Sequence, residues 1–235
     1  GRPTVHKKWD DNTAVLSGDV MLIQAVQHFF ALNAEGGYEA LQLMVRTMQE
    51  ICEGQQYDVN FEQRDDVALE EYMEMIRLKT SVLLACAAKM GALLGGASEA
   101  DAETLYRFAE KVGLAFQLQD DYLDVYGDPA VFGKNIGGDI LCGKKTFLLI
   151  GALTKASAEK RLEILNLIND KTIEPQTKIK MVTDIYDVLD VPSLCQKNIE
   201  TLYAEACRLW ESLSLSEERK SALWDFAVSM LKRKS

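Results

Sequence analysis

Proline is scarce in this sequence: 235 residues contain four, at Pro3, Pro129, Pro175 and Pro192. Runs in which Val, Ile, Thr or Tyr alternate with polar residues, the usual pattern of a half-buried strand, are hard to find. Long stretches consist instead of Ala, Leu, Met, Glu, Lys and Gln, which are strong helix formers. The lack of helix breakers and of strand patterns therefore predicts an all-α protein.

Long apolar runs are also missing. The best candidate for a membrane span, Val82 to Leu94, is interrupted by Lys89 and is too short to cross a bilayer, and no signal-peptide pattern is present. The five cysteines form no CxxC pair, which is typical of reduced cysteines in the core of a cytoplasmic protein. We therefore expect a cytoplasmic protein without stable membrane insertion.

Positive charge is in short supply. The 26 Lys and Arg residues face 36 Asp and Glu residues, and the formal net charge is −10. Most of such a surface repels a phosphate backbone, so we expect no nucleic-acid partner. A small phosphorylated substrate would need a local group of lysines or a divalent metal ion.

Helical periodicity covers most of the chain, and a hydrophobic fraction of 48% allows a substantial core. We expect helices over residues 13–32, 38–56, 67–94, 101–125, 145–153, 158–169, 175–188, 193–212 and 217–232. Asp65 and Asp66 are placed to cap the third of these helices. Residues 127–143 contain five glycines, and this is the only clearly non-helical segment that we interpret as a candidate functional loop. Without repeats or long linkers, residues 1–235 are expected to form one helical domain.

The strongest chemical signal is a carboxylate trio near the end of the fourth helix, Asp120, Asp121 and Asp124. On a helical wheel, Asp120 and Asp124 share a face with Gly113 and Gln117, while Asp121 lies on the flank of that face. Neighbouring carboxylates repel one another, and a hard divalent cation with oxygen ligands relieves the repulsion, with Mg²⁺ fitting best. A solvated acidic helix end is the alternative. Gly113 weakens that alternative, because a glycine inside a helix usually has a packing or access reason.

A second signal is the glycine- and lysine-rich segment from Gly133-Lys134 to Gly143-Lys144. Ammonium groups and backbone N–H donors on such a segment can wrap an anionic ligand. The spacing is not that of a P-loop. An ordinary solvated basic loop is the alternative. The closeness of this segment to Asp124 in the sequence favours a metal ion and a diphosphate lying between the two groups.

A third signal is the pair Lys79-Thr80, which interrupts an otherwise apolar helix. A buried ammonium group is costly unless it meets an anion. The alternative is a lysine whose ammonium reaches solvent beside a threonine that bonds back to its own helix.

Taken together, these residues resemble the trans-isoprenyl diphosphate synthase family, which includes farnesyl and geranylgeranyl diphosphate synthases. The resemblance covers essentially the whole chain. Its motifs follow in the family's order: Ser17-Gly18-Asp19, Gly54-Gln55-x-x-Asp58, Lys79-Thr80, Phe116-Gln117-x-x-Asp120-Asp121-x-x-Asp124, Gly133-Lys134 and Gly143-Lys144-x-Thr146.

The resemblance implies a single large helical bundle of the isoprenoid synthase type with a central active-site cavity. It implies a prenyltransferase that condenses isopentenyl diphosphate with an allylic diphosphate (dimethylallyl, geranyl or farnesyl) to a longer all-trans isoprenyl diphosphate. The expected cofactor is Mg²⁺, with Mn²⁺ as an alternative, and the expected assembly is a homodimer. The Pro3-Thr4-Val5-His6 stretch resembles the short-chain enzymes more than the long-chain ones.

The resemblance also implies roles for individual residues. The metal would be held by Asp120 and Asp124, and by Asp121 through water. The allylic diphosphate would be bound by Lys79, Lys134 and Lys144. The oxygens facing the carbocation would come from Thr80 and Gln117. The catalytic set is therefore Lys79, Thr80, Gln117 and Lys134.

In this family a first aspartate-rich motif and an arginine pair would lie just before Gly1, so we expect the chain to begin partway through a larger protein. A non-catalytic partner subunit of a heteromeric prenyl diphosphate synthase is the main alternative function. The intact second motif and its lysines disfavour that alternative. A terpene cyclase is disfavoured by Lys79-Thr80 and Lys134. A purely structural helical bundle would not explain why Gly113 and the lysines occur at these positions.

Overall fold

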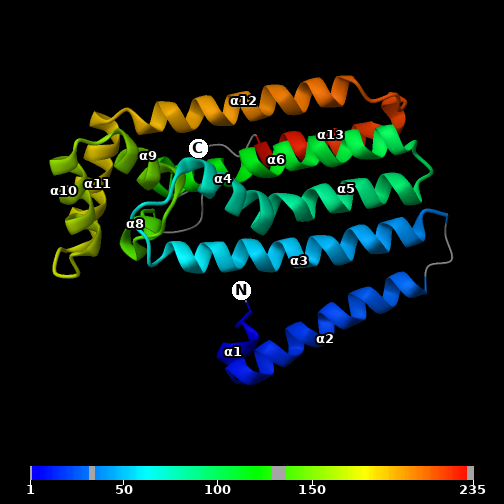
Figure 1. The fold of residues 1–235 in the computed structure, drawn as a ribbon, viewed down its shortest axis with the longest axis horizontal. Coiled ribbons are helices and arrows are strands. Elements are labelled where there is room, and N and C mark those ends of the chain that lie inside the picture. Colours follow the sequence, from blue (N-terminus) through cyan, green and yellow to red (C-terminus); the bar gives the residue numbers. More distant parts are fainter. Residues whose placement is uncertain (1, 32–34, 129–135, 232–235) are drawn as a thin grey trace.

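The structure is a computed structural model that describes residues 2–31, 35–128 and 136–231. Within these ranges every regular element is a helix and no strand occurs, which confirms the predicted all-α class. The long helices α3, α5, α6 and α12 run side by side along the molecule, and the short helices α8 to α11 gather at one end (Figure 1).

The first elements are α1 Val5–Lys8, α2 Asp11–Phe30, α3 Gly37–Phe61, α4 Leu69–Ile76, the π-helical turn η1 Arg77–Ser81, α5 Val82–Leu94 and α6 Glu99–Tyr126. The remaining elements are α8 Gly138–Cys142, α9 Phe147–Lys155, α10 Ala158–Asn169, α11 Pro175–Val188, α12 Val191–Glu211 and α13 Glu217–Leu231.

The predicted helix over residues 67–94 is not continuous. It begins two residues later than expected, at Leu69, and changes to π-helical geometry between α4 and α5. A second difference lies in the glycine-rich segment, where residues 138–142 form the short helix α8. Helices α10 and α11 have the predicted bounds. The periodicity of apolar residues thus located the helices but not the internal change of helix type.

Helix α6 is the centre of the packing. Its second half joins a core cluster with α4, α9, α10, α11 and α12, in which Ala115 and Leu118 are fully buried. Its first half joins a second cluster with α5, α12 and α13, in which Phe108 packs against Trp210. Because α6 is covered on several sides, polar side chains on it are held in place by neighbouring helices.

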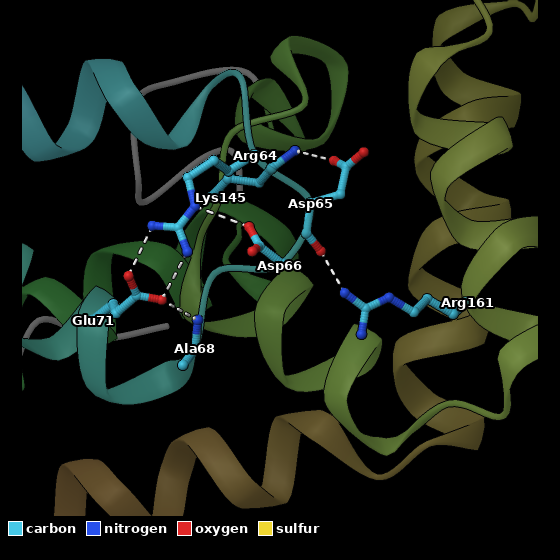
Figure 2. A network of polar contacts seen from close by, with 7 residues as sticks. All are labelled: Arg64, Asp65, Asp66, Ala68, Glu71, Lys145 and Arg161. Carbon is cyan, nitrogen blue, oxygen red and sulfur yellow. Dashed lines mark hydrogen bonds and ion pairs between the residues drawn. The ribbon is translucent and has the colours of Figure 1, made fainter.

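The prediction that Asp65 and Asp66 cap the third helix is wrong. The N-cap of α4 is Ala68, and its backbone N–H donates to the carboxylate of Glu71 at 2.9 Å. Arg64 ties this cap to the preceding loop, because its guanidinium pairs with Glu71 at 2.8 Å and with Asp66 at 2.9 Å (Figure 2). The capping side chain is therefore Glu71, a residue inside the helix. The usual pattern of Ser, Thr, Asp or Asn at the N-cap position does not predict it.

Asp65 instead joins the loop between α3 and α4 to residues that lie 80 and more positions later in the sequence. Its carboxylate accepts from Lys145 at 3.0 Å, and its carbonyl oxygen accepts from the guanidinium of Arg161 (Figure 2). The Lys145 side chain is 9% exposed. Loop 62–68 is thus attached to the segment that precedes α9 and to α10, and Lys145 is occupied in this attachment.

Helix α2 packs only lightly on the rest of the molecule. It lies along α3 and α1 at the edge of the bundle (Figure 1), and none of its residues is buried. Among the residues that the structure describes, no helix has both the length and the apolar character needed to cross a membrane.

Candidate active site

The π-helical turn η1 carries Lys79 and Thr80. Two glycines on neighbouring helices allow the turn to pack closely. A Cβ atom on Gly113 of α6 would lie 2.8 Å from the Cα of Ser81, and one on Gly54 of α3 would lie 2.8 Å from the backbone carbon of Leu78. Real Cβ atoms do not approach other atoms this closely. The packing reason expected for Gly113 is therefore contact with η1, and π-helical turns occur frequently at functional sites.

Lys79 meets an anion of the protein itself. Its ammonium lies 2.5 Å from the carboxylate of Asp58, near the end of α3, and the two side chains are 35% and 20% exposed. The lysine is thus half-buried and paired, and its charge is directed toward the region where α3 ends.

The three aspartates of the acid motif have different surroundings. Asp120 and Asp124 are half-buried, whereas Asp121 is 2% exposed. Asp121 accepts hydrogen bonds from the hydroxyl of Tyr72 on α4 and from the backbone N–H of Phe147, the latter at 3.1 Å. Burial, partly offset by these hydrogen bonds, raises the pKa of Asp121 to about 6. Asp121 therefore points into the core between α4 and α9, although the wheel placed it on the flank of the acid face.

Asp124 contacts the start of α8. Its carboxylate accepts the backbone N–H of Asp139 at 3.0 Å, and its carbonyl oxygen accepts the N–H of Gly137 at 2.6 Å. Burial is the largest influence and raises the pKa of the Asp124 carboxyl. The end of α6 and the start of α8 are thus fixed to each other.

Lys144 lies among carboxylates. Its ammonium is 3.5 Å from Asp139. Burial acts against its charge, but the carboxylates of Asp139, Asp121 and Asp58 outweigh burial, and the pKa of Lys144 is raised. Lys134, predicted beside it as a second ligand of the diphosphate, lies outside the described residues.

Thr80 and Gln117 lie together across the interface of η1 and α6. The Thr80 hydroxyl donates to the amide oxygen of Gln117 at 3.5 Å, and the amide nitrogen of Gln117 donates to Asp121 at 3.4 Å. The structure therefore brings Lys79, Thr80 and Gln117 to one region.

Two residues of this region were not assigned by the sequence. Tyr72 was visible only as the residue seven positions before Lys79, and Asp139 only as one residue of the glycine-rich segment. A tyrosine spaced in this way, on the helix that leads to the Lys79-Thr80 pair, is the signal that could have indicated a partner for a buried carboxylate.

The carboxylates fit a magnesium ion better than a transition metal. Within the described residues, no three His, Cys, Asp or Glu side chains form a ready-made metal cage. Mg²⁺ needs only one or two carboxylates, since water and phosphate oxygens complete its shell. Asp120 and Asp124, one helical turn apart on α6, supply hard oxygen donors of this kind. Asp121 is already engaged by Tyr72 and Phe147.

The described part of the chain is thus a helical bundle in which a carboxylate pair, two lysines and an adjacent amide and hydroxyl lie on neighbouring elements. The chain belongs to the polyprenyl synthetase family, whose model, described as Polyprenyl synthetase, matches residues 1–186.

Curated relatives include several proteins named as prenyl diphosphate synthases. A short chain isoprenyl diphosphate synthase of Methanothermobacter thermautotrophicus is 42% identical over 169 residues, which cover 72% of this chain and 52% of the relative. A geranylgeranyl diphosphate synthase of Methanosarcina mazei is 37% identical over 202 residues, covering 85% of this chain and 61% of the relative. The chain thus spans about half the length of the curated relatives that it matches.

Solved structures show the same fold. A geranylgeranyl pyrophosphate synthase superposes with a TM-score of 0.90 at 40% identity, covering 100% of this chain and 72% of that one. The geranylgeranyl pyrophosphate synthetase of Pyrococcus horikoshii superposes with a TM-score of 0.91 at 29% identity, covering 100% of this chain and 71% of that one.

Proposed function

We propose that this chain carries the site at which a prenyltransferase ionises an allylic diphosphate and joins it to isopentenyl diphosphate. The observation that supports the proposal best is the position of Asp58. This carboxylate pairs with Lys79 and contributes to the raised pKa of Lys144, whose ammonium lies 3.5 Å from Asp139. The N–H of Asp139 donates to Asp124, so two lysines from distant parts of the sequence share one region with the acid motif of α6. Two cations gathered beside hard carboxylates suit a diphosphate bound together with a metal ion.

The reaction begins when the allylic C–O bond breaks and its electron pair leaves with the diphosphate. The π electrons of isopentenyl diphosphate then form the new C–C bond. The resulting cation loses a proton, which the departed diphosphate accepts, and a double bond re-forms. The charges that must be stabilised are thus negative on the leaving group and positive on the carbon skeleton.

The side chains divide these tasks. Lys79, Lys144 and, in the segment outside the described residues, Lys134 would neutralise the leaving diphosphate. Mg²⁺, or Mn²⁺ in its place, would be held by Asp120 and Asp124 and would supply Lewis-acid stabilisation of the same oxygens. The oxygens of Thr80 and Gln117 would face the positive carbon, since both are electron-rich and lie together.

The product and assembly are further parts of this proposal. The relatives are named short chain isoprenyl, geranylgeranyl and geranylfarnesyl diphosphate synthases, and this supports an allylic product of short to medium length. The apolar surface of α2, described below, supports a homodimer, and the reduced cysteines support a cytoplasmic enzyme. We also propose that residues 1–235 belong to one helical domain.

The test is a condensation assay on the complete protein with radiolabelled isopentenyl diphosphate, an allylic diphosphate and Mg²⁺. Wild type should incorporate label, and Asp120→Ala should lose activity by at least about 100-fold. Asp184→Ala removes an exposed carboxylate paired with Lys180 on α11 and should have little effect. A folded wild type that incorporates no label would contradict the proposal and favour the non-catalytic partner subunit.

A further inference from the structure

The buried pair Tyr72 and Asp121 is not used by the reaction just described. Tyr72 is 1% exposed and Asp121 is 2% exposed, and the hydroxyl of Tyr72 donates to the carboxylate. The two residues come from α4 and α6, so this contact joins the helix that leads into η1 to the helix of the acid motif. A buried carboxylate whose hydrogen bonds are this specific fixes the positions of the groups that contact it.

The two oxygens of Asp121 serve different partners. Oδ2 accepts from Tyr72 and from the N–H of Phe147, whereas Oδ1 accepts from the amide nitrogen of Gln117 at 3.4 Å. Both oxygens of Asp121 thus accept hydrogen bonds, and the nitrogen end of the Gln117 amide faces Oδ1. The oxygen end must then face Thr80, whose hydroxyl donates to it at 3.5 Å.

We infer that Tyr72 and Asp121 are positioning residues that fix the orientation of the Gln117 amide and so present its oxygen beside Thr80. The inference rests on the proposed function, in which that oxygen faces the carbon that becomes positive. Without Asp121 as an acceptor, the amide could rotate and direct its N–H groups toward the carbocation, which would raise the barrier to ionisation.

Loss of the Tyr72 hydroxyl should affect kcat and not KM. The carbon becomes positive only as the C–O bond breaks, so the Gln117 oxygen stabilises the transition state and not the bound substrate. Removal of the Tyr72 hydroxyl should therefore lower kcat and leave KM for the allylic diphosphate nearly unchanged. The 3.4 and 3.5 Å separations are long for hydrogen bonds, and catalytic contacts often shorten when substrate binds.

The experiment is a double-mutant cycle in the complete protein with Tyr72→Phe and Gln117→Ala, measured at saturating isopentenyl diphosphate and Mg²⁺. Tyr72→Phe should lower kcat about 10-fold with KM within about twofold. In the Gln117→Ala background the same change should alter kcat less than about twofold, because the residue through which Tyr72 acts is gone. Tyr126→Phe, which removes a hydroxyl-to-carboxylate bond between α6 and exposed Asp187, is the matched control and should keep wild-type kcat.

Asp121→Asn is the second variant. It tests the same inference if the Tyr72→Phe protein does not fold. Its single amide oxygen cannot accept from both sides, so it should also lower kcat, and only when Gln117 is present. Full kcat in a folded Tyr72→Phe or Asp121→Asn protein, or an equal loss of kcat with and without Gln117, would overturn the inference while the proposed function stands. A wild type without condensation activity would overturn both.

Discussion

At the scale of single residues, the three aspartates of the acid motif show what a helical wheel can and cannot predict. The wheel grouped Asp120 and Asp124 correctly on one face, because spacing alone fixes that relation. It could not decide whether Asp121 on the flank meets solvent or core, since that depends on α4 and α9. Those helices bury Asp121 to 2% exposure. The predicted metal set thus consists of two half-buried carboxylates and one buried carboxylate that is hydrogen-bonded to Tyr72 and Phe147.

The pairing of Lys79 with Asp58 leads to a prediction about substrate affinity. Lys79→Ala should weaken binding of the allylic diphosphate by about 10- to 100-fold, as expected for a charged hydrogen bond worth about 1.5–3 kcal/mol. The melting temperature should change little, because the partly exposed pair with Asp58 contributes modestly to stability. Isothermal titration calorimetry and thermal unfolding measure the two quantities.

Lys180→Ala is the control, because it removes an exposed lysine that also pairs with a carboxylate. It should leave affinity and melting temperature unchanged. If Lys79→Ala unfolds the protein while the remaining folded fraction keeps full affinity, Lys79 is a structural lysine. The prediction that it binds the diphosphate would then be wrong.

At the scale of elements, the sequence predicted where the helices lie but not the π-helical turn. The spacing of apolar residues over 67–94 is that of one continuous helix. The π-helical turn η1 changes this spacing too little to be detected in the sequence. Gly113 was the only indirect sequence signal that we identified for the π-helical turn. Its close contact with Ser81 depends on the approach of α6 to η1, which is a tertiary feature.

The glycine contact leads to a second prediction. Gly113→Ala should destabilise the protein by about 1–3 kcal/mol, because the added methyl group overlaps the backbone of η1. It should also lower condensation activity by displacing Lys79 and Thr80. Gly91→Ala in α5 is the matched control, since nothing lies within 4 Å of the added Cβ. That change should stabilise the protein by about 0.5–1 kcal/mol. Equal stability changes in the two variants, measured by urea unfolding, would contradict this role of Gly113.

A third prediction concerns the attachment of the C-terminal helices. Asp101, in the first turn of α6, accepts from the Ser214 N–H at 2.9 Å and from the hydroxyls of Ser214 and Ser98. Hydrogen bonds from the Ser214 hydroxyl, the Ser214 N–H and Ser98 lower the pKa of Asp101 from its ordinary value. A carboxyl group with a lowered folded-state pKa stabilises the fold above its unfolded pKa, and this stabilisation is lost as the pH falls through the folded value.

Asp101→Asn should therefore lower the melting temperature at pH 7, and the gap to wild type should narrow below about pH 4. Glu99→Gln, at an exposed position in the same helical turn, should show no such gap. Thermal unfolding between pH 2.5 and pH 7 is the measurement, and a gap independent of pH would show that the Asp101 charge does not contribute.

At the scale of the whole molecule, α2 is the unusual feature. Its exposed apolar side chains are Val15, Leu16, Val20, Met21, Leu22, Ile23 and Phe30, with exposures between 49% and 76%. A helix that is apolar around most of its circumference is normally covered. The homodimer expected from the family resemblance would supply such a cover.

Met21→Glu should shift the complete protein from dimer to monomer in sedimentation velocity, because a charge at a 69% exposed position costs the monomer little but cannot be buried in an apolar interface. Gln27→Glu adds the same charge at a polar position and should leave the dimer unchanged. A wild type that is monomeric, or a Met21→Glu variant that stays dimeric, would show that something other than a second copy covers α2.

We propose that the carboxylates of α6 and the lysines Lys79 and Lys144 hold one metal–diphosphate unit between them. The direct test is calorimetric titration of the complete protein with an allylic thiolodiphosphate, in which sulfur replaces the bridging oxygen and slows ionisation, with and without Mg²⁺. Mg²⁺ should strengthen binding of the analogue at least about 10-fold, the analogue should strengthen Mg²⁺ binding by the same factor, and Asp120→Ala should abolish this coupling. Equal affinity with and without Mg²⁺, or full coupling in Asp120→Ala, would contradict it.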